Sequence, residues 1–501
     1  MKKAFLAKGV YSGGNEVLDT GFVVDGSMIV DVVSNSQIKS EVVDAEKIYL
    51  DGFVYPSAID SHVHLKELAF SIISLDASQV KSFKELIELI NSSKDNPAYI
   101  YNLDFNYITD EEWLKLFNEK RRLFVQSKDV HSVFVSKVFL DESKIFPKEV
   151  SGGELKYFSG VFVGVFKDRA ADIVFSLKDR EFKKDYFKLI DEYFLERGIT
   201  AVVNFDCDML KILQQSKEDF KIRVVQAIHK DDVFDAVRNG MRTGDGDGKL
   251  KIGPVKLFID GSLGSQTAFM FYRRPFKGLL LMSETELEDR VSFANENGLQ
   301  VAVHAIGSGA TYIAMKVFKN LGRRNILNRI EHLQFIELEH LDLLRESHFI
   351  ASMQPVHAIS DYELYMKYMG GFKLAYAWNT VKKYGKTLIF GSDTPVDDAS
   401  FIKGVHAATK RTTLDSGLGY LFEETVDVGS AINAYTFDGY RANYFGNEFG
   451  EIASGKKADF IVLKNSLFGH EKRKGLHLFD VGRTKNAVLK TFMEGNEIWT
   501  K

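Results

Sequence analysis

The stretch FVYPSAIDSHVHL at residues 53–65 is an apolar, strand-like run that ends in two histidines, His62 and His64. In an extended chain, residues i and i+2 point to the same face, so both imidazoles can reach one metal ion. Two surface or packing histidines would show the same spacing. The interpretation therefore depends on what stands at the ends of the other predicted strands.

Seven further apolar runs have the length and composition of strands. They are residues 198–206, 222–228, 252–260, 299–305, 329–335, 349–355 and 387–393. Helix-like stretches such as 284–297 and 309–321 lie between them. Strands that alternate with helices indicate βα units and a parallel sheet. With residues 53–61 there are eight such runs, which predict an α/β fold of the (β/α)8 TIM-barrel type. An open doubly wound sheet is the alternative.

The segments outside these units also show a pattern. The first two predicted strands are too far apart for a single crossover, so residues 67–197 are predicted to form an insertion over the barrel mouth. Residues 1–52 and 449–501 contain short strands and turns, within the chain-end segments 1–52 and 430–501. Because chain ends often lie close together, these two segments are predicted to form one small β-sandwich. The predicted barrel spans residues 53–429, insertion included.

The composition is that of a globular protein. The chain has 501 residues, 45% of them hydrophobic and 27% charged, with a net charge of -4. This balance does not favour a nucleic-acid partner, and no run approaches the ~18 apolar residues that span a bilayer. The apolar stretch after Lys3 is too short for a secretory signal, and the single cysteine, Cys207, suits a reducing compartment. We therefore expect a cytoplasmic protein without a membrane partner.

Four more chemically active residues stand in or at the ends of predicted strands. Lys256 lies in the fourth, His304 in the fifth and His332 in the sixth, and Asp393 closes the eighth. The carboxyl ends of barrel strands converge on one site. A buried lysine or aspartate is unfavourable unless it is paired or metal-bound, so the pattern predicts a metal site. Glu331 would point to the opposite face of its strand from His332 and is interpreted as structural.

The same stretches resemble the amidohydrolase superfamily of metal-dependent hydrolases. Within it the sequence is similar to the amidohydrolase-3 family, whose members include N-substituted formamide deformylases. The resemblance runs nearly end to end. It is strongest in FVYPSAIDSHVHL (53–65), VKLFIDGSLGSQTAFM (255–270), VAVHAIGSGA (301–310), RIEHLQFI (329–336), GSDTPVD (391–397) and GEIASGKKADFIVL (450–463).

The resemblance implies a role for each candidate. The implied metal ligands are His62, His64, Lys256, His304, His332 and Asp393. The first two histidines would bind the more buried ion and the last two a second ion. Lys256, carboxylated by carbon dioxide, would present a carbamate that bridges them. Asp393 would also be catalytic and shuttle the proton. One or two divalent ions are expected, most simply zinc, with manganese, iron and nickel as alternatives.

Four residues are candidates for substrate binding. Asp129 and His131 lie in the insertion, in a stretch that resembles a family motif near the substrate. An exposed loop pair is the alternative for these two. Gln354 and His357 follow the seventh predicted strand, where they could contact substrate or form a network within the loop.

These features predict a hydrolase that uses metal-activated water to cleave a C–N bond of a small molecule, in an amide, a formamide or a cyclic amide. Hydrolysis of esters or phosphate esters by the same site is one alternative, and a non-catalytic scaffold of the same fold is another. The expected partner is a small-molecule substrate, and a homodimer is the candidate assembly. The many Phe and Tyr residues in the insertion favour an apolar or aromatic leaving group.

Overall fold

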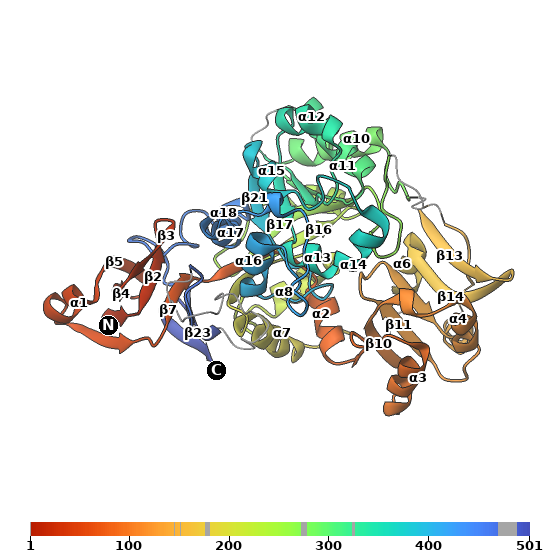
Figure 1. Cartoon of the computed structure of the whole chain (residues 1–501), viewed down its shortest axis with the longest axis horizontal. Coiled ribbons are helices and arrows are strands. Elements are labelled where there is room, and N and C mark those ends of the chain that lie inside the picture. The colour runs from red at the N-terminus through yellow and green to blue at the C-terminus, as the bar shows by residue number, and fades with distance from the viewer. Residues whose placement is uncertain are drawn as a thin grey trace.

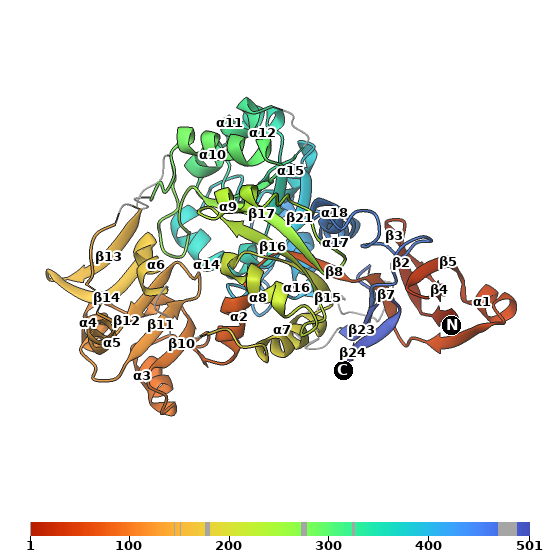
Figure 2. The same cartoon turned by 180° about the vertical axis from the view of Figure 1, so that it is seen from behind.

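The structure is a computed structural model that describes residues 2–144, 146–150, 152–175, 181–271, 278–322, 326–468 and 488–501. Figures 1 and 2 show a central body of strands and helices between two lobes. One lobe holds both ends of the chain, and the other is built from the segment between β8 and β15.

The central body is a sheet of eight strands. They are β8 (Ala58–Val63), β15 (Ile199–Asn204), β16 (Arg223–His229), β17 (Leu250–Phe258), β18 (Val301–Ala305), β19 (Arg329–His332), β20 (Ile350–Met353) and β21 (Thr387–Phe390). The strands follow chain order around the sheet, with one long segment between β8 and β15, and neighbouring strands are parallel. A bridge between Val63 and Thr394 brings the first strand beside the segment after the last, so the barrel is nearly closed. The predicted barrel is confirmed, and the open sheet is excluded.

Helices surround the barrel. They include α7 (Tyr186–Leu195), α8 (Leu210–Gln215), α9 (Val233–Arg238), α10 (Glu284–Glu296), α11 (Ser308–Asn320), α12 (Leu341–Glu346), α13 (Pro355–Ser360), α15 (Trp378–Lys383), α16 (Phe401–Lys410), α17 (Val428–Tyr435) and α18 (Phe437–Ala442). The two helices expected at 284–297 and 309–321 correspond to α10 and α11. Helix α10 begins after Ser283, whose hydroxyl accepts a hydrogen bond from the N–H of Glu286.

The first predicted strand, 53–61, is two strands rather than one. Strand β7 (Phe53–Pro56) pairs with strands of the chain-end lobe, and β8 begins only at Ala58. Between them, the N–H of Ser57 donates to the carbonyl of Asp459, and the Ser57 hydroxyl lies 2.6 Å from Oγ1 of Thr200. The chain therefore passes from one sheet to the other at Ser57, held there by residues far away in the sequence.

The lobe with both chain ends consists of two sheets. One has the order β5-β4-β1-β6, with β5 (Met28–Ser34), β4 (Thr20–Asp25), β1 (Lys2–Leu6) and β6 (Ala45–Tyr49). The other has the order β24-β23-β22-β7-β2-β3, with β24 (Asn496–Thr500), β23 (Val488–Met493), β22 (Phe460–Leu463), β2 (Gly9–Ser12) and β3 (Asn15–Leu18). Aromatic rings from both ends of the chain fill the space between the sheets; Phe460 and Phe492 stack at 4.3 Å, and Phe5 packs edge-on to both. The predicted β-sandwich is confirmed, although residues 469–487 of the expected segment lie outside the described residues.

The segment between β8 and β15 begins with α2 (Leu65–Ile72) and then forms a sheet of its own. Its order is β13-β14-β12-β11-β10-β9, with β13 (Gly153–Phe158), β14 (Val161–Asp168), β12 (Ser132–Val135), β11 (Leu123–Ser127), β10 (Ala98–Leu103) and β9 (Leu75–Asp76). The helices α3 (Phe83–Ser92), α4 (Asp110–Phe117), α5 (Lys137–Ser143) and α6 (Arg169–Phe175) accompany it. Buried side chains such as Trp113 and Phe134 give this lobe a separate apolar core. Among the described residues, no helix is long and apolar enough to cross a membrane.

Candidate metal centre

The predicted metal ligands gather at the carboxyl ends of the barrel strands. His62, Lys256, His304 and His332 belong to β8, β17, β18 and β19, and Asp393 follows β21. All five are buried, and His64, just after β8, is partly buried. Parallel strands place their carboxyl ends at one rim, which explains why residues so far apart in the chain meet here.

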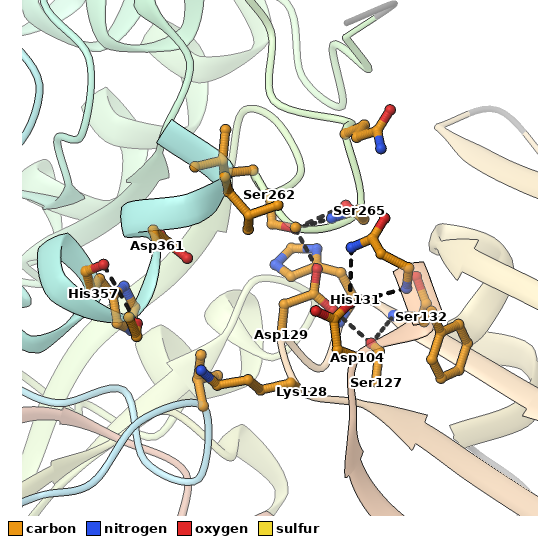
Figure 3. A pocket seen from close by; sticks show the side chains of 18 of the residues that line it. Asp104, Ser127, Lys128, Asp129, His131, Ser132, Ser262, Ser265, His357 and Asp361 are labelled. Atoms are coloured by element: carbon orange, nitrogen blue, oxygen red, sulfur yellow. Dashed lines mark hydrogen bonds between the residues drawn. The ribbon is translucent and has the colours of Figure 1, made fainter. Parts of the chain in front are cut away.

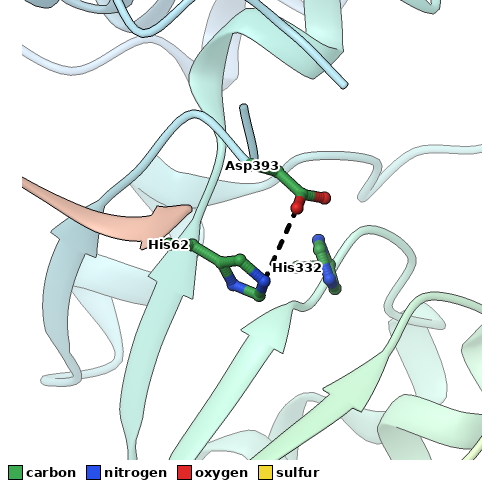
Figure 4. A group of neighbouring side chains, drawn as sticks. All are labelled: His62, His332 and Asp393. Atoms are coloured by element: carbon green, nitrogen blue, oxygen red, sulfur yellow. Dashed lines mark ion pairs between the residues drawn. The ribbon is translucent and has the colours of Figure 1, made fainter. Parts of the chain in front are cut away.

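Three of these residues form a tight group (Figure 4). His62, His332 and Asp393 each offer one ligand atom, and the three atoms lie within 4.8 Å of one another. The backbone of His332 has φ of 71° and that of Asp393 has φ of 62°. Such positive values are unusual outside glycine and cluster at functional sites, where the surrounding structure holds them.

His64 approaches the same oxygen of Asp393 as His62 does. Its Nε2 lies 3.2 Å from Oδ1 of Asp393, and its Nδ1 lies 2.9 Å from Oδ1 of Asp206. Burial alone would lower the pKa of His64, but the hydrogen bonds to Asp206 and Asp393 raise that pKa to about 10. A cation held by His64 and Asp393 would replace this ion pair.

Lys256 and His304 complete the predicted set. Nζ of Lys256 lies 3.4 Å from Nε2 of His62 and above the rings of Phe205 and Phe258. The ring of His304 lies 4.5 Å from that of His332, and its Nε2 is 3.1 Å from the carbonyl oxygen of Gly261. His304 is therefore adjacent to the tight group, with its Nε2 directed to the backbone.

The protonation states suit a metal site. Burial lowers the pKa values of His62, His304 and His332 well below the usual range, and the charge of Lys256 lowers them further. Burial would raise the pKa of Asp393, but His62 and His64 hold it well below its usual value. Neutral imidazoles and an ionised carboxylate are the forms that bind divalent cations, so His62, His304, His332 and Asp393 fit such an ion, and His64 would release its proton on joining them.

Several partners of these residues were missed by the sequence analysis. Oε2 of Glu331 lies 2.7 Å from Nδ1 of His62, and Arg329 in turn donates to both oxygens of Glu331. Glu331, which the sequence led us to interpret as structural, thus contacts a predicted ligand directly. We expected the side chains of Glu331 and His332 to point to opposite faces because side chains alternate along a regular strand. The positive φ of His332 breaks that alternation. Together with Asp206 beside His64, Glu331 fixes the orientation of a predicted ligand.

A cleft of about 620 Å³ opens above the group, between the barrel and the lobe that carries β12 and β14 (Figure 3). His304, His332 and Asp393 lie among the residues that line it. Of the four substrate-binding candidates, Asp129, His131 and His357 also line the cleft. Gln354 is not among its lining residues; its Oε1 lies 2.9 Å from Nδ1 of His332 and so orients a predicted ligand.

The two candidates from the insertion have definite partners. Nδ1 of His131 lies 2.8 Å from Oδ1 of Asp168, and its ring lies 5.5 Å from that of His304. Asp129 accepts hydrogen bonds from Ser127 and, at 2.7 Å, from Ser262 of the loop after β17. Asp129 thus connects the insertion to the barrel, and these two residues are not an isolated exposed pair.

His357 stands on the opposite wall of the cleft. Its ring is nearly parallel to that of His332 at 6.1 Å, and its Nε2 lies 3.9 Å from Oδ2 of Asp393 and 3.7 Å from Oδ2 of Asp397. Among the described residues this buried Nε2 has no hydrogen-bond partner, so it remains available to a bound molecule.

The lining of the cleft does not support the expected apolar leaving group. The aromatic residues of the insertion fill its own core, as Trp113 and Phe134 do, whereas the cleft is lined largely by lysines, carboxylates, serines and histidines. Only Phe105 and Tyr107 supply aromatic rings among the described lining residues from that lobe.

A nearly closed parallel barrel with histidines and an aspartate at its strand ends is the architecture of a metal-dependent hydrolase. Residues 41–494 match the amidohydrolase family Amidohydro_3, and the chain belongs to that family. The expectation drawn from the sequence motifs is thus confirmed.

Individual relatives are distant but cover most of the chain. Protein LONG AFTER FAR-RED 3 of Arabidopsis thaliana is 24% identical over 96% of this chain and 85% of its own. YtcJ of Bacillus subtilis is 23% identical, and the N-substituted formamide deformylase of Arthrobacter pascens is 22% identical; each match covers 88% of this chain and 89% of the relative.

Solved structures show the same fold. An uncharacterized metal-dependent hydrolase from Pyrococcus horikoshii aligns with a TM-score of 0.75 and 24% identity, over 94% of this chain and all of that one. Its counterpart from Pyrococcus furiosus gives a TM-score of 0.73, with 24% identity over 93% of this chain and 99% of that chain.

Proposed function

We propose that this amidohydrolase-family protein is a metal-dependent hydrolase that cleaves a C–N bond, in an amide, formamide or cyclic amide of a small molecule. The observation that carries the proposal is the buried group of His62, His332 and Asp393 at the foot of the cleft. The deformylase among the relatives acts, by its name, on N-substituted formamides, which supports the bond type.

The proposed ligands are the six residues of the sequence analysis: His62, His64, Lys256, His304, His332 and Asp393. One or two divalent ions, most simply zinc, would be held there and would lower the pKa of water from ~15.7 towards ~7, which makes a nucleophile available at neutral pH. Asp393 is ionised because His62 and His64 hold its pKa down, and its carboxylate faces the cleft. We assign to Asp393 the transfer of the proton from the attacking water to the leaving amine.

Lys256 is proposed to carry a carbamate. Burial lowers the pKa of its ammonium group to about 8, against the opposing charges of Glu331 and Asp393, so that free amine is accessible near neutral pH. The amine nitrogen forms a bond to the carbon of carbon dioxide and releases one proton, and the product is an anionic group among the histidines. Incubation with 13C-bicarbonate should give a carbamate signal in the NMR spectrum that Lys256→Met removes.

The test of the function combines metal analysis with a substrate screen. Protein purified without chelator is expected to contain about one to two equivalents of divalent metal and to hydrolyse some members of a panel of N-formyl, N-acyl and cyclic amides. Removal of the metal by a chelator should abolish the activity, and addition of zinc should restore it. Protein that neither contains nor takes up metal would contradict the proposal, as would hydrolysis that survives chelation.

A further inference from the structure

The walls of the cleft carry several positive charges. Among the described residues that line it are five lysines: Lys81, Lys128, Lys156, Lys167 and Lys367. Lys81 and Lys367 are exposed at the rim, where water solvates them. The other three are half-buried, and a half-buried ammonium group needs a partner more than an exposed one does.

Two of the half-buried lysines have carboxylate partners within the protein. Nζ of Lys128 lies 3.6 Å from Oδ1 of Asp397, and Nζ of Lys156 lies 2.7 Å from Oδ1 of Asp110. Lys167 differs: among the described residues its Nζ has only the carbonyl oxygen of Ser265, at 3.5 Å, and no carboxylate within ion-pair distance. Its positive charge thus has no ion-pair partner among the described residues of the cleft.

The position of Lys167 relates it to the proposed reaction centre. Lys167 pairs with Ser132 across the β12–β14 ladder, and the next residue, Asp168, holds His131, whose ring contacts that of His304. Opposite partners in a ladder share a face, so the Ser132 hydroxyl stands beside the lysine side chain. Ser265 belongs to the loop that begins at Gly261, the backbone partner of His304. A molecule that reaches the metal ligands with one end can therefore reach Lys167 with the other.

We propose that Lys167 binds a carboxylate on the substrate, so that the molecules hydrolysed are amides with an anionic group remote from the bond that is cleaved. The inference rests on the proposed function and adds the substrate class. A carboxylate at Lys167 supplies an ion-pair partner and forms a charge-assisted hydrogen bond, with the hydroxyl of Ser132, its partner across the ladder, as a further donor. The hydrogen bond from Lys167 to the Ser265 carbonyl is weak at 3.5 Å and is easily exchanged for a hydrogen bond to the substrate carboxylate.

The test uses N-formyl-ω-amino acids of increasing chain length, each compared with its own uncharged carboxamide. At the chain length that spans the two sites, the parent protein should use the acid roughly 10- to 100-fold better in kcat/KM than the carboxamide, as expected for a hydrogen bond to a charged group. Lys167→Met should remove that advantage and leave kcat/KM for the carboxamides within about twofold of the parent value. Lys156→Met is the matched control, since this lysine lines the same cleft but already has Asp110 as partner.

Two results would overturn the assignment of Lys167. One is equal use of acids and carboxamides at every length, and the other is an equal effect of Lys167→Met on both series. If no amide is hydrolysed at all, the proposed function fails, and calorimetric titration of the same compounds into metal-loaded protein decides the carboxylate site separately. In this titration, the carboxylate site is supported if the acids bind more tightly than the carboxamides and if Lys167→Met removes this difference. Equal binding of both series, or no binding of either, contradicts the carboxylate site.

Discussion

The sequence and the structure assign different roles to Gln354. It is a sequence-based candidate for substrate contact, yet its Oε1 lies 2.9 Å from Nδ1 of His332, and its buried Nε2 has no partner in the part of the chain that the structure describes. Gln354→Met keeps the volume and removes the acceptor. We expect metal affinity to fall about 10- to 100-fold, because His332 loses the group that orients it. Competition with a fluorescent chelator measures this change; unchanged metal affinity with an altered KM would return Gln354 to substrate binding.

Asp393 is the residue on which the proposed chemistry depends most. Asp393→Asn preserves the size and one ligating oxygen but removes the basic group. General acid–base catalysis contributes roughly 10²–10⁴-fold, so kcat should fall by at least ~10²-fold. Metal content should be largely retained, since the four histidines remain. Steady-state kinetics and elemental analysis of the same preparation separate the two effects, and near-parental kcat would require a different base.

The sequence predicted the histidines, Lys256 and Asp393 of the site because strand ends of a barrel can be recognised locally. It did not reveal Glu331 and Asp206 as their partners. Each partnership links two strands, Glu331 to His62 across 269 positions and Asp206 to His64 across 142. Pairings of this kind depend on barrel closure and on the backbone at His332, neither of which has a local sequence signal.

At the scale of elements, a hydrogen bond between Ser262 and Asp129 is one of the contacts that join the insertion to the barrel. The Ser262 hydroxyl of the loop after β17 donates to Asp129, next to β11 and β12, and a Cβ on Gly264 would lie 2.8 Å from the same carboxylate. Ser262→Ala removes this link. We expect faster hydrogen exchange over residues 127–135 and a higher KM with unchanged metal content, because the wall of the cleft is held less firmly.

Ser454→Ala is the control for that experiment. Its hydroxyl donates to the Val30 carbonyl at 2.9 Å in the chain-end lobe, away from the cleft. It should leave both KM and exchange at 127–135 at the parental values. If Ser262→Ala behaves like this control, the insertion is held by other contacts.

Element types were predicted better than their boundaries. The eight apolar runs were recognised because alternation of strands and helices is a local signal. The division of residues 53–61 into β7 and β8 was not, since β7 is drawn into the other sheet by β22, about 400 positions later. The internal sheet of the insertion was likewise beyond the sequence analysis, because its parallel and antiparallel pairs mix within one sheet.

At the scale of the whole molecule, a buried ion pair ties the barrel to the chain-end lobe. Arg223 of β16 donates to Asp459, just before β22, and the side chains are 4% and 1% exposed. Arg223→Met leaves the carboxylate buried without its ionic partner, which should lower the free energy of unfolding by about 3–5 kcal/mol. The exposed pair Arg345–Asp342 provides the comparison. Arg345→Met should change the free energy of unfolding by ~1 kcal/mol or less. Apparent Tm values of the two variants measure these changes. Equal Tm shifts would contradict the larger contribution assigned to the buried Arg223–Asp459 pair.

The separate core of the insertion has a consequence for how this protein can diverge. Its apolar cluster around Trp113 is built entirely from residues 75–165, while the proposed metal ligands all belong to the barrel. Drift in the insertion can therefore reshape the wall that carries Lys167 without disturbing the metal ligands. Proteins that descend from one ancestral barrel could therefore acquire new substrate selectivity by exchanging the insertion. A chimera with the insertion of a relative should show that relative's selectivity and keep its own metal stoichiometry.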